Sequence, residues 1–86
     1  TNFLDEMMRG IEINLRVEEI KLSNSLAGKN FSEIKTDDLP NTIVMAIKEN
    51  NNWVFNPPKN HIILPDSTMI VMTSPEERII LEKKYS

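Results

Sequence analysis

The 86-residue sequence lacks several residues on which common protein chemistries depend. It contains no cysteine, which excludes disulfides, thiolate metal sites and cysteine nucleophiles. Its one histidine, His61, cannot supply a multi-histidine metal cluster. Its two glycines, Gly10 and Gly28, cannot build a dinucleotide-binding or Walker-type phosphate loop. No apolar run approaches the roughly 20 residues that a membrane-spanning helix requires, so we expect a soluble domain.

The overall composition of the chain is typical of one small folded domain. Hydrophobic residues make up 40% of the chain and charged residues 27%, which lies within the range of globular proteins. The net charge is −3, so the sequence carries no electrostatic footprint of nucleic-acid binding. The absence of cysteine fits a reducing compartment and favours a cytoplasmic location.

The beginning of the chain predicts a boundary at Gly10. The chain starts at Thr1 rather than at methionine, so we expect it to be part of a larger protein. Apolar residues keep helical spacing up to Gly10, which predicts that residues 1–10 end a preceding linker helix and that residues 11–86 form the domain. From Ile11 the pattern alternates, and its phase slips at Glu18-Glu19, which predicts a bulge or a break between two strands.

The middle of the chain predicts a short helix followed by a β-hairpin. Asn30 can cap a helix of one or two turns before Pro40. The nearly continuous apolar run 42–48 predicts a central strand buried on both faces. The asparagines 50–52 then predict a turn into a strand over 53–55, which the prolines 57 and 58 must end.

The last third predicts a strand and a helix. Pro65-Asp66 marks a turn before a buried strand over 68–73. Ser74, Pro75 and Glu77 form a helix start, and the helix runs to about Tyr85. We expect Ile79, Ile80 and Leu81 to face inward and Met45, Met69 and Met72 to fill the core. The fold class is therefore α+β, with a small, mostly antiparallel or mixed four-stranded sheet, a short helix and a C-terminal helix.

The candidate catalytic residues do not form a recognisable site. The adjacent carboxylates include Glu76-Glu77, which helix capping explains, and Asp37-Asp38, which lies in a turn. No Gly-x-Ser-x-Gly motif accompanies His61, so it is either a loop histidine or a polar contact of a ligand. We therefore expect no enzyme. Trp53 and Phe55 beside the proline turn can shape a shallow pocket or a dimer contact, or they can serve the fold alone.

Four motifs follow one another in an order that points to a known family. They are Ser25-Leu26-Ala27-Gly28-Lys29-Asn30-Phe31, Ile43-Val44-Met45-Ala46-Ile47-Lys48, Asn56-Pro57-Pro58 and Ser74-Pro75-Glu76-Glu77. Together they resemble the C-terminal module of the potassium-conductance regulators, called RCK-C or TrkA-C, over about residues 16–85. Two positions depart from the family pattern: its Gly-Asp turn is Pro65-Asp66 here, and the glycine that ends its last strand is Ser74.

The resemblance implies a cytosolic regulatory domain that controls gating in a potassium channel or uptake system. The partners it implies are a second copy in a homodimer, an N-terminal RCK lobe and a membrane pore or transporter subunit, and it implies no catalysis and no bound metal or cofactor. It also implies that cyclic di-AMP is a possible regulatory ligand. The positions that match such a pocket are Ile43, Val44, Asn52, Asn56, Pro57, Pro58 and His61. Lys59 is the nearest obvious partner for the two phosphates.

Three alternatives stay open. The same module also occurs on cation-proton antiporters and anion permeases. The domain can equally be a structural dimerisation unit without a ligand. A small hydrolase would require a nucleophile beside His61.

Overall fold

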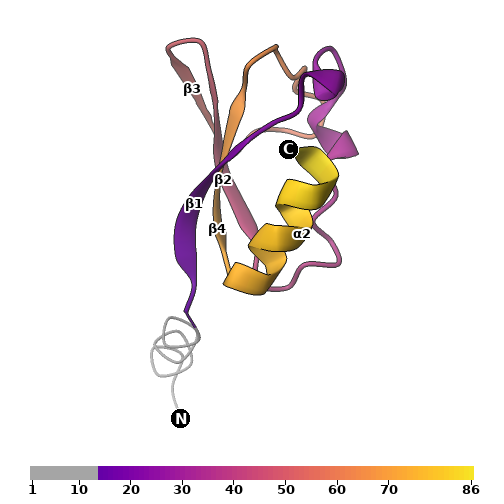
Figure 1. Ribbon diagram of the computed structural model, residues 1–86. Helices are drawn as coiled ribbons and strands as arrows, with labels where there is room; N and C mark the ends of the chain where they lie inside the picture. Colours follow the sequence, from indigo (N-terminus) through magenta and orange to yellow (C-terminus); the bar gives the residue numbers. More distant parts are fainter. Residues whose placement is uncertain (1–13) are drawn as a thin grey trace.

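Residues 14–86, which the computed structural model describes, form an antiparallel sheet with its helices on one side (Figure 1). The elements are β1 (Arg16–Lys21), the 3-10 helices η1 (Asn24–Leu26) and η2 (Phe31–Glu33), β2 (Ile43–Glu49), β3 (Asn52–Phe55), β4 (Thr68–Thr73) and α2 (Pro75–Tyr85). The four strands lie in the order β1-β4-β2-β3, and every neighbouring pair is antiparallel. The predicted α+β class is confirmed, and the sheet is antiparallel rather than mixed.

The hydrophobic core lies between one face of the sheet and the helices. Side chains alternate between the faces of a strand, and Ile20, Ile47, Met69 and Val71 all point to the face that Leu81 of α2 covers. The loops between β1 and β4 complete this core with Leu22, Leu26, Phe31, Ile34, Leu39 and Ile63. In Figure 1, α2 and both 3-10 helices lie on the same side of the sheet. The opposite face of the sheet carries no helix among the described residues.

The C-terminal helix begins as the sequence predicts. The Ser74 side chain accepts a hydrogen bond from the backbone N–H of Glu77, and Pro75 occupies the first turn. The prediction that Ile79 and Ile80 face inward is wrong, because both are exposed and the buried positions are Glu77 and Leu81. A stripe at intervals of four residues therefore faces the sheet.

The buried Glu77 carboxylate ties the helix to the segment before β2. It accepts hydrogen bonds from the Asn41 backbone N–H, at 3.0 and 3.2 Å, and from the Thr42 hydroxyl at 2.7 Å. The hydroxyls of Thr42 and Thr73 are 2.7 Å apart. The sequence pattern identified Glu77 only as a helix-start residue. Its acceptor role was missed because its partners lie about 35 positions earlier in the chain.

The first strand, β1, is regular, and the irregularity of the sheet lies in β2. β1 pairs with β4 without interruption, so the bulge or break expected at Glu18-Glu19 is wrong. The apolar pattern changes parity because its residues lie on opposite faces of the strand. Val17 faces away from the core, and Ile20 is the buried residue of β1. The register shift in the described sheet occurs in β2, between Val44 and Ala46. Ile11 and residues 1–10, with the predicted linker helix, lie outside the described residues.

The strand β2 is central but is not buried on both faces along its whole length. It lies between β4 and β3, which confirms the predicted position. Ile47 on the core face and Ala46 on the open face are both buried, whereas Ile43 and Met45 are exposed, so the expected burial on both faces holds only in the middle of the strand. Met45 is correspondingly no core filler, while Met69 is fully buried. A nearly continuous apolar run predicts burial only when a second layer covers each face.

Most of the predicted turns and short elements are confirmed. Asn50 has φ +54° in the two-residue loop between β2 and β3, and Asp66 has φ +60° in the turn before β4. Both residue types tolerate the left-handed region better than most. The helix expected after Asn30 is one 3-10 turn, and the Asn30 side chain makes no capping hydrogen bond. η1, capped by the Ser23 side chain, was not predicted.

Candidate functional site

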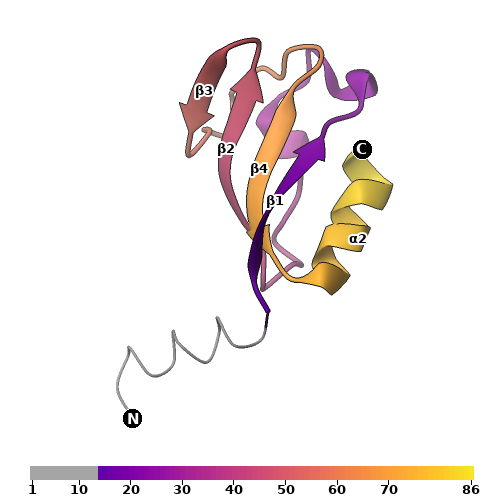
Figure 2. The same ribbon diagram turned by 60° about the vertical axis from the view of Figure 1, so that its left-hand side comes forward.

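The candidate site is the face of the sheet that α2 does not cover, called here the open face. Figure 2 shows its four strands side by side. The strand register arranges its side chains in three rows across the strands. The rows are Val17, Met72 and Ile43; Glu19, Ile70, Ala46 and Phe55; and Lys21, Thr68, Lys48 and Trp53.

Two of the three rows of the open face are mainly apolar, where a solvent-facing sheet would be polar. Phe55 is 73% exposed, Ile43 65%, Val17 57% and Trp53 48%. Single exposed apolar residues are ordinary, but these belong to adjoining rows and to neighbouring strands. Contiguous exposed apolar patches are typical of interaction surfaces, which makes the open face the candidate site.

One end of the open face carries two stacked aromatic rings. The rings of Trp53 and Phe55 have centroids 6.1 Å apart and an interplanar angle of 11°. The Lys48 ammonium lies 5.6 Å from the Trp53 ring centroid, within the range of a cation–π contact. Both rings stand on β3, an edge strand. If Trp53 and Phe55 form the predicted pocket or dimer contact, they form it on the open face.

The predicted ligand residues occupy two ends of β2 rather than one place. Ile43 begins β2 on the open face, and the backbone N–H of Asn56 donates to the Met45 carbonyl oxygen at 2.9 Å, two positions further along. Asn52 pairs with Glu49 at the other end of β2, so Ile43 and Asn52 are separated by on the order of 20 Å. Within one copy of the chain, the seven residues do not converge.

The remaining predicted residues differ in their burial. Val44 is half-buried and packs against the core, Pro57 is buried, and Pro58 is exposed. The His61 Nε2 atom lies 3.0 Å from the Glu49 Oε2 atom, so the imidazole in its Nε2–H form donates to that carboxylate. His61 therefore has a protein partner near the end of the hairpin. In the described part of the chain, no hydroxyl hydrogen-bonds to the His61 ring, as a hydrolase would require.

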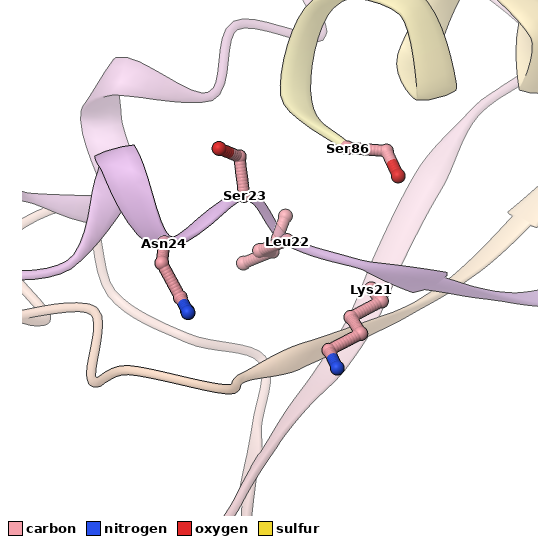
Figure 3. Close-up of a pocket in the computed structure, with 5 residues that line it drawn as sticks. All are labelled: Lys21, Leu22, Ser23, Asn24 and Ser86. Atoms are coloured by element: carbon pink, nitrogen blue, oxygen red, sulfur yellow. The ribbon is translucent and has the colours of Figure 1, made fainter.

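Two cavities lie outside the open face. One, of about 250 Å³, opens between the end of β1 and the C-terminal end of α2 (Figure 3). Its lining residues are Lys21, Leu22, Ser23, Asn24 and Ser86. Two of its polar side chains already have partners, because Ser23 bonds to Ser25 and Asn24 to Asp66. The other cavity, of about 340 Å³, lies beside η2.

Two further features were searched for in residues 14–86. That part of the chain holds no group of three or more histidine or carboxylate side chains able to bind a metal ion. Nor does it include a helix with the length and apolar character needed to cross a membrane.

Comparisons with known proteins give one family match. The family model described as the TrkA-C domain matches residues 15–83. A search of curated proteins found no match.

Solved structures with this fold include an RCK C domain and a channel. The RCK C domain of the potassium transport protein KtrA, in complex with cyclic diadenosine monophosphate, has a TM-score of 0.72 at 19% identity. The match covers 93% of this chain and 92% of that domain. The GsuK channel bound to NAD has a TM-score of 0.68 at 19% identity, covering 95% of this chain and 16% of the channel. The chain therefore spans most of that RCK C domain and a small part of the channel's length.

Proposed function

Because the chain belongs to the TrkA-C domain family, we propose that it is a dimerising, ligand-sensing regulatory domain of a potassium channel or uptake system. The open face is the observation that supports this proposal. It is an apolar surface on a domain whose other sheet face is fully used by the core.

The occupant of the open face is a second copy of the chain. Sheets pack face to face at about 10 Å, and a stable interface buries roughly 800 Å² on each partner. The face carries charges of both signs, with Glu19 on β1 and Lys48 on β2, so a two-fold partner offers acids to bases. The exposed rings of Trp53 and Phe55 add the aromatic area that is enriched at interface centres.

The proposed ligand is a cyclic dinucleotide bound where two copies meet. The KtrA RCK C domain was solved with such a molecule, and Ile43, Asn56 and Pro58 lie at exposed positions here. Because Ile43 begins β2 and Asn52 of β3 pairs with its last residue, the seven predicted residues require both copies to form one pocket. Val44 contributes through its backbone, since its side chain packs against the core. The open face offers the ammonium group of Lys48 for the phosphates, whereas Lys59, the partner expected from the sequence, lines the cavity beside η2.

The proposed mechanism is a shift between dimer arrangements. A ligand that binds one arrangement more tightly raises its population, and an attached lobe passes that bias to a pore. The preceding RCK lobe, the membrane subunit and the cytoplasmic location belong to this proposal, as does the domain boundary at residue 11. The family's regulatory role involves no catalytic step.

Two alternatives keep the same fold. The domain can serve a cation-proton antiporter or an anion permease, which changes the host and leaves the open face as it is. It can also dimerise without a ligand. The KtrA domain solved with cyclic diadenosine monophosphate favours the ligand-binding alternative.

The test is the solution mass of the 86-residue chain together with its thermal stability in cyclic di-AMP. We expect a dimer, and a ligand at a hundredfold excess over its dissociation constant raises the unfolding free energy by about 2.7 kcal/mol. The Asn56→Gly variant, in which glycine tolerates the left-handed backbone at this position (φ +48°), should stay dimeric and lose most of this shift. The Asn60→Ala variant, at an exposed asparagine outside the predicted set, is the control and should keep it. A monomer at all concentrations would overturn the dimer, and a dimer without any shift would leave the structural alternative.

A further inference from the structure

The larger cavity lies on the helix side of the sheet, away from the open face. It has a volume of about 340 Å³ and lies between η2 and the loop that carries Lys59. Its lining residues are Phe31, Ser32, Ile34, Lys35, Thr36, Asp37 and Lys59. The volume lies at the lower end of the range of small-molecule sites, roughly 300–1,000 Å³.

The walls of this cavity are held by backbone hydrogen bonds from three parts of the chain. The Ser32 N–H donates to the Lys59 carbonyl oxygen at 2.9 Å, which joins the two walls. The Lys35 N–H donates to the Tyr85 hydroxyl at the end of α2, also at 2.9 Å. The floor is apolar, because Phe31 and Ile34 belong to the buried core. The cavity is therefore pre-formed.

The rim of the cavity carries polar groups without protein partners. Within residues 14–86, neither Lys35 nor Lys59 makes an ion pair, and neither the Ser32 nor the Thr36 hydroxyl makes a hydrogen bond to the protein. Elsewhere in the fold, the hydroxyls of Ser67 and Thr42 are hydrogen-bonded. The two ammonium groups outnumber the single carboxylate, Asp37, so the lining is net positive in a chain whose net charge is −3.

We infer that this cavity binds a small organic anion, with a phosphate or carboxylate held by Lys35 and Lys59 and an apolar body resting on Phe31. Ammonium groups bind phosphate as point charges, and the two hydroxyls can donate to the same oxygens. Asp37 accepts from a hydroxyl or amino group of the ligand and repels a polyphosphate. The site is separate from the open face, so its ligand and a second copy of the chain can bind together.

The experiment is a titration of the 86-residue chain with phenyl phosphate, followed through backbone amide resonances. We expect shifts concentrated in residues 31–37 and 58–61. Phenyl phosphate should bind about tenfold more tightly than inorganic phosphate, since its ring adds buried apolar area. A parallel titration with benzoate distinguishes a carboxylate site from a phosphate site, and phenol, which is neutral, should not bind.

Matched variants separate this site from general attraction by lysines. The double variant Lys35→Gln, Lys59→Gln should weaken binding of phenyl phosphate about tenfold or more, since both charged contacts are lost. The double variant Lys29→Gln, Lys84→Gln removes the same charge from exposed positions outside the cavity and should bind as the parent chain does. Equal weakening in both double variants, or shifts spread over all lysine-bearing surfaces, would overturn the inference.

Discussion

The two faces of the sheet are built from alternate residues of the same strands, yet they meet different surroundings. On β2, Ile47 is fully buried against the core, while Ile43 on the opposite face is 65% exposed. Both are isoleucines, so residue type does not distinguish them. The difference is that α2 and the loops cover one face, and no described element covers the other. Ile47 therefore stabilises the monomer, whereas an apolar side chain as exposed as that of Ile43 contributes little to it and can stabilise an assembly.

The largest expected effect comes from shortening the two isoleucines. At concentrations where the chain is monomeric, Ile47→Ala should lower the unfolding free energy by about 3–4 kcal/mol, because it leaves a cavity in the core. Ile43→Ala should lower it by less than about 1 kcal/mol, as an exposed position does. Urea denaturation measures both.

If the Ile47→Ala chain does not fold, Ile47→Val with a smaller loss of about 1 kcal/mol keeps the comparison measurable. Equal losses at the two positions would contradict the account of the two faces.

The next effect concerns the hydrogen bonds that hold the covered side together. Glu77→Gln should lower the unfolding free energy by about 2 kcal/mol, because the buried Thr42 hydroxyl and the Asn41 N–H lose a charged acceptor. The control is Glu76→Gln, which changes an exposed carboxylate in the same helical turn. A loss of similar size in both variants would show that the helix dipole, and not the buried contacts, stabilises this end of α2.

The smallest effect is expected at the aromatic end of the open face. Lys48→Gln removes the ammonium beside the Trp53 ring and should cost about 0.5 kcal/mol, with a shift in the fluorescence of Trp53. Lys21→Gln removes a charge from the same row at the other edge of the sheet and should leave the emission unchanged. An identical response in the two variants would mean that the lysine acts through net charge alone.

The sequence predicted the elements whose signals are local. The turn at Asn50, the cap at Ser74 and the end of β3 before Pro57 each depend on a few adjacent residues, and all are confirmed. The errors arose where tertiary contacts decide. Ile79 and Ile80 are apolar, but only the stripe with Glu77 and Leu81 meets the sheet.

The candidate site shows the same division. The order of the four motifs predicted the family, because order and spacing along the chain can be read directly from the sequence. The open face was not predicted as a unit, because it joins Val17, Ile43 and Phe55 through strand pairing across distant parts of the sequence. The ligand role of the seven residues remains a prediction. Their grouping in the sequence does not place them together, because adjacent residues such as Ile43 and Val44 point to opposite faces of the sheet. A pocket shared between two copies leaves no compact signature in a single sequence.

The most direct test of the open face as a dimer interface is sedimentation equilibrium on a pair of matched variants. Phe55→Ser removes the most exposed aromatic ring of the open face, and Ile79→Ser removes a similarly exposed apolar side chain from α2. The account predicts that Phe55→Ser raises the dimer dissociation constant at least about tenfold, as loss of an interface anchor does, and that Ile79→Ser leaves it unchanged. A dimer that survives Phe55→Ser and dissociates with Ile79→Ser would place the interface on the helix and contradict the account.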